Sequence, residues 1–134
     1  PLAELVERVS PVVKVLAYSR SMGTDALASE ISDAVGALAT VTTSLVHDQF
    51  GMAELSVPGV TKARTLAELC ADLGVEASEV VAFGDMPNDL EMLDWAGRAF
   101  VMDDGHPLLQ SRFEGAGACG DAGVGRVIRA LLRG

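Results

Sequence analysis

Residues 80–90 read VVAFGDMPNDL, a short apolar run followed by a group of polar side chains. The run at 80–83 has the length and β-branched content of a buried strand. Pro87 suits the first turn of a helix, where its missing N–H is not needed. The stretch therefore predicts a strand, a tight loop and a helix. In open parallel sheets, ligands bind at the carboxyl ends of such strands.

The chain on both sides of this stretch alternates helices and strands. Thr61 and Gly74 bracket a predicted helix over 62–73, by N-capping and by ending it. A strand is expected at 99–102, a short helix from Pro107, a last strand at 116–119 and a closing helix at 124–132. Short apolar strands between helices are typical of a parallel sheet covered on both faces.

The preceding part of the chain has a different order of elements. After a short amphipathic segment at 2–9, the pattern predicts a strand at 12–18, a helix at 24–38 and strands at 40–45 and 52–57. Pro58 and Gly59 form a break. We therefore expect two parts, an α+β layer over 1–57 and a parallel α/β part over 58–134.

Composition narrows the class of protein. The chain has 134 residues, 49% of them hydrophobic, which argues against intrinsic disorder. Its formal net charge of −9 disfavours nucleic acid as a partner, because phosphate backbones require clustered Lys and Arg. No apolar run is long enough to span a membrane. Cys70 and Cys119 are not spaced as a disulfide framework or zinc site. These features predict a soluble, cytoplasmic protein that binds neither nucleic acid nor membranes.

Candidate functional side chains gather at the loop after strand 80–83. Asp85 and Asp89 are four residues apart and can share one side of a helical turn, with Asn88 between them. Two carboxylates and an amide suit Mg²⁺ and a phosphate. The alternative is that these residues only cap the helix. Lys62 lies in a helical first turn, where the dipole disfavours a cation, so it is either a phosphate-neutralising group or an ordinary surface lysine.

Several motifs together resemble a known family, the haloacid dehalogenase superfamily, and within it the Cof-type sugar-phosphate phosphatases. The similarity rests on Gly59-Val60-Thr61-Lys62 and on residues 84–93, GDMPNDLEML. Further matching segments are Ala96-Gly97, His106-Pro107 and Asp121-Ala122-Gly123-Val124. The resemblance implies a Rossmann-like core, of which 58–134 would be the C-terminal part, preceded by the C-terminal part of a small α+β cap over 1–57.

The resemblance also implies roles for individual residues. Members hydrolyse phosphate monoesters through an aspartyl-phosphate. By position, Lys62 resembles the lysine that binds the phosphoryl group, and Asp85 the acidic Mg²⁺ ligand. Asp89 resembles the second carboxylate of the metal site, and Asn88 the amide that contacts the phosphoryl group. The implied catalytic residues are thus Lys62, Asn88 and Asp89, and the implied metal ligands Asp85 and Asp89.

The sequence departs from the family pattern at three places. Ala63 stands where glycine usually follows the lysine, and Asp103-Asp104-Gly105 stands where Gly-Asn-Ala is common. The Asp-x-Asp motif that carries the nucleophile is absent from the chain. We therefore expect the C-terminal part of a longer phosphatase, inactive alone because covalent catalysis needs its nucleophile. Its partners would be the missing N-terminal segment and a small phosphorylated metabolite, and unpaired strand edges are compatible with oligomer formation.

Two other functional classes compete with this hypothesis. One is a non-catalytic phosphate-binding or interaction module, a degenerate relative of the same family. The other is a phosphotransfer receiver domain, which is also acidic and doubly wound. The element order before Pro58 argues against a receiver domain. His47, on a turn between two predicted strands, is interpreted as a solvated turn residue rather than as a substrate contact.

Overall fold

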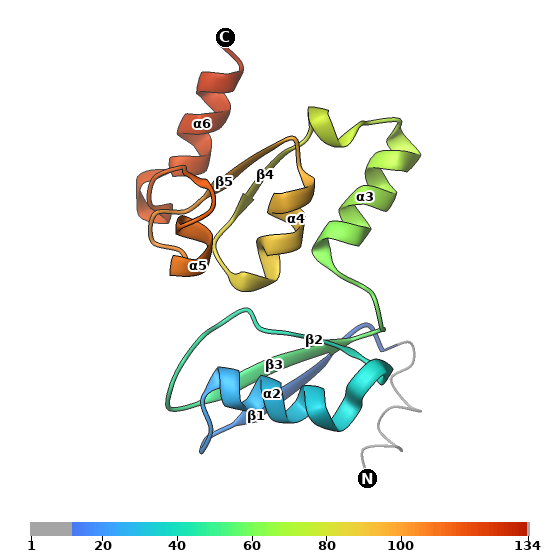
Figure 1. Cartoon of the computed structure of the whole chain (residues 1–134). Helices are drawn as coiled ribbons and strands as arrows, with labels where there is room; N and C mark the ends of the chain where they lie inside the picture. Colours follow the sequence, from blue (N-terminus) through green and yellow to red (C-terminus); the bar gives the residue numbers. More distant parts are fainter. Residues whose placement is uncertain (1–11, 134) are drawn as a thin grey trace. The chain divides into compact units, whose positions relative to one another are not determined.

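The computed structural model describes residues 12–133. The predicted amphipathic segment at 2–9 lies outside these residues. Contacts within the chain divide it into two compact units, Pro1–Val60 and Thr61–Gly134. The sequence had placed a boundary after residue 57, so the structural division lies three residues later. Each unit contains its own sheet (Figure 1).

The first unit is an antiparallel sheet with one helix. It consists of β1 (Val15–Ser19), α2 (Thr24–Val35), a 3-10 turn (Gly36–Leu38), β2 (Thr40–Thr42) and β3 (Gly51–Ser56). The strand order is β1-β3-β2, and both pairs are antiparallel. The strand expected at 40–45 ends at Thr42, and the helix expected to reach Leu38 finishes as a 3-10 turn. Gly36 has φ 52°, which ends the α-helical geometry there.

The second unit is built on a parallel sheet. Its helices and strands are α3 (Lys62–Leu73), β4 (Val81–Gly84), α4 (Leu90–Trp95), β5 (Arg98–Val101), α5 (Pro107–Gln110), β6 (Glu114–Gly115) and α6 (Gly123–Leu131). Short 3-10 turns η2 (Ala77–Glu79), η3 (Pro87–Asp89) and η4 (Cys119–Asp121) connect them. The strand order is β4-β5-β6, with both neighbouring pairs parallel. The predicted α/β class is confirmed.

Local signals explain where α3 begins and ends. The Thr61 side chain accepts a hydrogen bond from the backbone N–H of Arg64 at 3.2 Å, as an N-cap does. Gly74 adopts φ 69° and ends the helix in the left-handed conformation that glycine tolerates. Both features match the sequence prediction for this helix.

The strand predicted at 116–119 is wrong. The short strand β6 precedes it, at Glu114–Gly115, and pairs with Phe100 and Val101 of β5. The apolar pattern misled because Ala116 is buried although it lies beyond the strand. At Gly117, with φ 96°, the chain turns out of the sheet direction and continues into η4.

Two apolar clusters cover the two faces of the parallel sheet. On one face, Ala82 and Val101 pack with Leu93 of α4 and Leu109 of α5. On the other, three buried residues (Phe100, Met102 and Ala116) pack with Phe83 and with Val124, Val127 and Leu131 of α6. Side chains alternate along a strand, so β5 supplies both clusters. This arrangement holds the carboxyl ends of β4 and β5 in fixed positions.

Candidate functional site

The buried carboxylate of Asp89 organises the candidate site. Asp89 is 3% exposed and lies at the end of η3, directly before α4. Its Oδ1 is 2.5 Å from Nζ of Lys62, at the start of α3. Its Oδ2 accepts the backbone N–H groups of Asp85 at 3.0 Å and Met86 at 3.1 Å. One carboxylate thus connects the first turn of α3 to the loop after β4.

Gly84 is required by this arrangement. A Cβ at position 84 would lie 2.6 Å from Cβ of Asp89 and 3.0 Å from its Oδ2. Real Cβ atoms do not approach so closely, so only glycine lets β4 end against the aspartate. Pro87 then begins η3, where its fixed φ suits a first helical position. The sequence Gly-Asp-x-Pro-x-Asp therefore determines the shape of the loop.

Asp85 differs from Asp89 in its surroundings. It is exposed, and within residues 12–133 its carboxylate makes no hydrogen bond or ion pair. Its main chain is fixed, however, because its carbonyl oxygen accepts the N–H of His106 at 2.7 Å. Gly105 is packed against it, since a Cβ there would lie 2.9 Å from the same oxygen. Asp85 therefore combines a fixed backbone with a carboxylate free to bind a ligand.

Asn88 supplies an unsatisfied polar atom to the same turn. Its Oδ1 is buried, and no hydrogen-bond partner for it exists among the residues that the structure describes. A buried acceptor without a partner is costly, so such atoms commonly bind a ligand, water or ion. The structure thus leaves the Asn88 side chain with unused binding capacity.

A cavity of about 360 Å³ opens beside Asp85 at the carboxyl end of β4. The strand ends form one part of its lining, and η4 and the start of α6 form another. The lining residues are Phe83, Gly84, Asp85, Met102, Cys119, Ala122, Gly123 and Val124. It is a largely apolar hollow with one exposed carboxylate at its edge.

Sequence reasoning missed the structural role of the loop after β5. Oδ1 of Asp103 accepts the N–H of Gly117 at 3.2 Å, and Oδ1 of Asp104 accepts the N–H of Cys119 at 3.0 Å. This backbone hydrogen bond is the main reason that the pKa of Asp104 is lowered. The pKa of the Cys119 thiol is raised, first by desolvation and then by the negative charge of Asp104. The adjacent acids were visible in the sequence, but their acceptor roles were not.

The two histidines have structural contacts. Nδ1 of His106 accepts the N–H of Leu108 at 3.2 Å, so this side chain caps α5. His47, in the first unit, is exposed and stacks on Phe50 with ring centroids 3.9 Å apart. Its main chain is fixed by Thr24, whose N–H donates to the His47 carbonyl at 2.8 Å.

The side chains present fit a metal ion only in part. Across the described range, no three His, Cys, Asp or Glu side chains are grouped so as to hold one. The free carboxylate of Asp85 is a suitable ligand for a hard cation. Both oxygens of Asp89 are already occupied by Lys62 and by backbone N–H groups. Any cation bound by Asp85 would therefore need further ligands from outside this set.

The family model and the curated relatives that this chain matches point to the same family. The model for haloacid dehalogenase-like hydrolases matches residues 3–119. A 5-amino-6-(5-phospho-D-ribitylamino)uracil phosphatase of Escherichia coli is 40% identical over 89 residues, which are 66% of this chain and 33% of that protein. An HMP-PP phosphatase of Klebsiella pneumoniae is 40% identical over 63 residues, covering 47% and 23% respectively.

Solved structures show the same fold. A haloacid dehalogenase-like hydrolase from B. subtilis matches 96% of this chain and 45% of its own, with a TM-score of 0.78 and 22% identity. One from Bacteroides thetaiotaomicron matches 92% and 45%, with a TM-score of 0.71 and 26% identity. The chain thus spans about a third of the length of the first curated relative and less than half of these solved chains. No helix among the described residues is long and apolar enough to cross a bilayer.

Proposed function

The chain belongs to the haloacid dehalogenase-like hydrolase family, and on that premise we propose that it forms part of a phosphate monoester hydrolase. The observation that carries the proposal is the connection of Lys62 to the Asp85 loop through the buried carboxylate of Asp89. Phosphoryl transfer depends on charge neutralisation and positioning more than on other chemistry. A cation held by Asp89, which also fixes the backbone of Asp85 at the carboxyl end of a parallel strand, meets both needs.

Each residue has a distinct role in this proposal. Lys62 neutralises negative charge on the phosphoryl group, and Asp89 holds its ammonium group and the loop backbone in place. Asp85 binds Mg²⁺, which when bound would offset phosphate charge and polarise the phosphoryl oxygens. The unpartnered Oδ1 of Asn88 marks it as a contact for the phosphoryl region or its water. Asp89 acts on the metal site indirectly in this proposal, by fixing the backbone of Asp85, because both of its carboxylate oxygens already have partners.

The nucleophile must come from another segment. The chain contains no Asp-x-Asp, and β4 is an edge strand whose Val81 is 37% exposed. We propose that a parallel strand from the longer protein pairs with this edge and presents an aspartate near Asp85. That aspartate would attack phosphorus, the substrate alcohol would leave, and water would then hydrolyse the aspartyl-phosphate. The chain alone is then inactive.

The proposed substrates are small phosphorylated metabolites, such as sugar phosphates. The E. coli relative is named for a phosphorylated ribitylamino-uracil, which falls in that class. The first unit, as part of a cap, would select among these metabolites. The net charge of −9 supports the prediction that nucleic acids are not partners. The cytoplasmic location also remains a prediction.

The test compares the chain alone with the longer protein that contains it. With a generic aryl phosphate and Mg²⁺, the longer protein should turn over substrate, lose activity in a metal chelator and regain it with added Mg²⁺. The chain alone should show no turnover. Turnover by the chain alone that Asp85→Ala abolishes would contradict the need for another aspartate. An inactive longer protein that still binds inorganic phosphate would favour the non-catalytic module instead.

A further inference from the structure

The loop between β5 and α5, residues 102–106, is attached on one side to the Asp85 loop. The N–H of Met102 donates to the carbonyl of Gly84 at 3.0 Å. Further along the loop, the N–H of His106 donates to the carbonyl of Asp85 at 2.7 Å. The loop therefore contacts the backbone of the two residues that end β4 and begin the candidate site.

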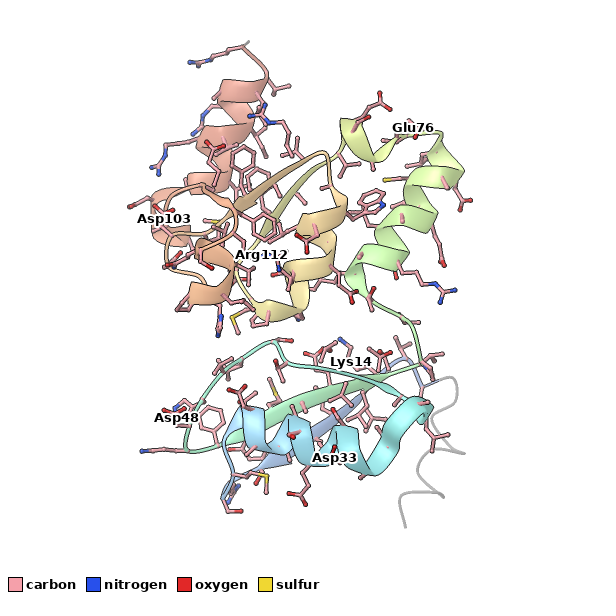
Figure 2. The ribbon with its side chains drawn as sticks, in the orientation of Figure 1. Lys14, Asp33, Asp48, Glu76, Asp103 and Arg112 are labelled. Atoms are coloured by element: carbon pink, nitrogen blue, oxygen red, sulfur yellow. The ribbon has the colours of Figure 1, made fainter. Side chains whose placement is uncertain are left out.

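The other side of this loop is attached to residues 117–119 by two carboxylates. Asp103 and Gly117 form a two-point contact, since the Asp103 N–H donates to the Gly117 carbonyl at 3.3 Å and its Oδ1 accepts the Gly117 N–H at 3.2 Å. Figure 2 labels Asp103 at this position. Gly115 provides the space, because a Cβ there would overlap Oδ1 of Asp103. Oδ1 of Asp104 accepts the Cys119 N–H at 3.0 Å.

The loop is also supported from α5. Nε2 of Gln110 donates to the carbonyl oxygens of Asp103 at 2.7 Å and Gly105 at 2.8 Å. Cys119, at the start of η4, lines the cavity that Asp85 borders. One supported loop thus connects the Asp85 loop to the part of the cavity lining that contains Cys119.

We propose that Asp103 and Asp104 are positioning residues, which set the distance between the carboxylate of Asp85 and the cavity wall at Cys119. The inference rests on the proposed function, because it assigns these contacts to the placement of the metal and phosphate site. It explains why two adjacent acids stand in this loop: their carboxylates accept backbone N–H groups that a shorter or apolar side chain would leave unpaired. Neither aspartate is itself a ligand in the proposal.

The first experiment measures the contact itself by amide hydrogen exchange in the protein. Asp104→Ala removes the acceptor, so the Cys119 amide should exchange about five- to tenfold faster, as expected for loss of one hydrogen bond. Asp104→Asn keeps an Oδ1 acceptor and should stay within about twofold of the parent. Asp94→Ala is the matched control, because Asp94 pairs with Arg112 at 3.0 Å and, among the described residues, makes no hydrogen bond or ion pair with this loop. Unchanged Cys119 exchange in Asp104→Ala overturns the proposed contact.

The second experiment measures the consequence in the longer, active protein. Asp104→Ala should raise the Mg²⁺ concentration for half-maximal activity by about tenfold and lower the thermal midpoint by no more than about 4 °C. In both Asp104→Asn and Asp94→Ala, the Mg²⁺ concentration for half-maximal activity should equal that of the parent protein. If Asp104→Asn needs as much Mg²⁺ as Asp104→Ala, the carboxylate acts by its charge, and the positioning role is wrong. Faster amide exchange with an unchanged Mg²⁺ requirement also overturns the role. An inactive parent protein would instead refute the proposed function, while the exchange result would still test the contact.

Discussion

Replacing Asp89 with alanine should destabilise the second unit more than any comparable change to a surface aspartate. The substitution removes the acceptor for the backbone N–H groups of Asp85 and Met86 and the partner of Lys62. Each lost backbone hydrogen bond costs about 1 kcal/mol. The Lys62 side chain is 51% exposed, so the ion pair adds only about 0–1 kcal/mol. The expected loss in free energy of unfolding is therefore about 2–3 kcal/mol.

Chemical denaturation followed by circular dichroism measures this loss. A double-mutant cycle with Lys62→Met measures the interaction energy between Asp89 and Lys62. Because Asp89→Ala already removes the ion pair, the double variant and Asp89→Ala should have free energies of unfolding within about 0.5 kcal/mol of each other. Asp94→Ala, which breaks an exposed ion pair, should cost under about 1 kcal/mol. A loss below about 0.5 kcal/mol for Asp89→Ala would refute the reasoning, because a buried carboxylate with three partners cannot then be organising the loop.

Three further predictions follow from the same geometry. Gly84→Ala should lower stability by about 1–3 kcal/mol in thermal or chemical unfolding, because its Cβ would press on Asp89; an unaltered unfolding midpoint would contradict the close approach. Asp85→Asn in the longer protein should lower kcat by orders of magnitude with little change in stability, since its carboxylate is exposed and unpaired among the described residues; activity within about twofold of the parent would contradict its proposed role. Because the pKa of Cys119 is raised and only the thiolate reacts, its alkylation rate should rise at higher pH than that of an unstructured cysteine peptide. In Asp104→Asn the rise should move to lower pH, and coincident profiles would contradict the effect of Asp104.

Regular elements with strong local signals could be predicted from the sequence. Helix α3 has its observed bounds because Thr61 caps it and Gly74 ends it, both through contacts within one or two turns. β4 was expected because an apolar run ends at Gly84 and Asp85. Coverage of both faces of the sheet was also expected, because consecutive apolar residues along β5 point to opposite faces.

Elements that depend on distant partners could not be placed in this way. β6 is two residues long and exists through its pairing with β5, so the apolar segment after it was mistaken for the strand. The end of the predicted strand 40–45 was also missed, because β2 extends only as far as its pairing with β3. Local sequence carries little information about where such pairing ends.

The sequence by itself determined which residue types stand at the carboxyl end of β4, because its last residue, Gly84, is closely followed by Asp85, Asn88 and Asp89. Only the tertiary structure decided their different environments. Asp89 is buried against Lys62, which is twenty-seven residues away, whereas Asp85 is exposed. Likewise, Asp103 and Asp104 meet Gly117 and Cys119 only after β5 and β6 pair. A side chain's charge and shape are local properties, but its burial and partners arise from packing between segments distant in sequence.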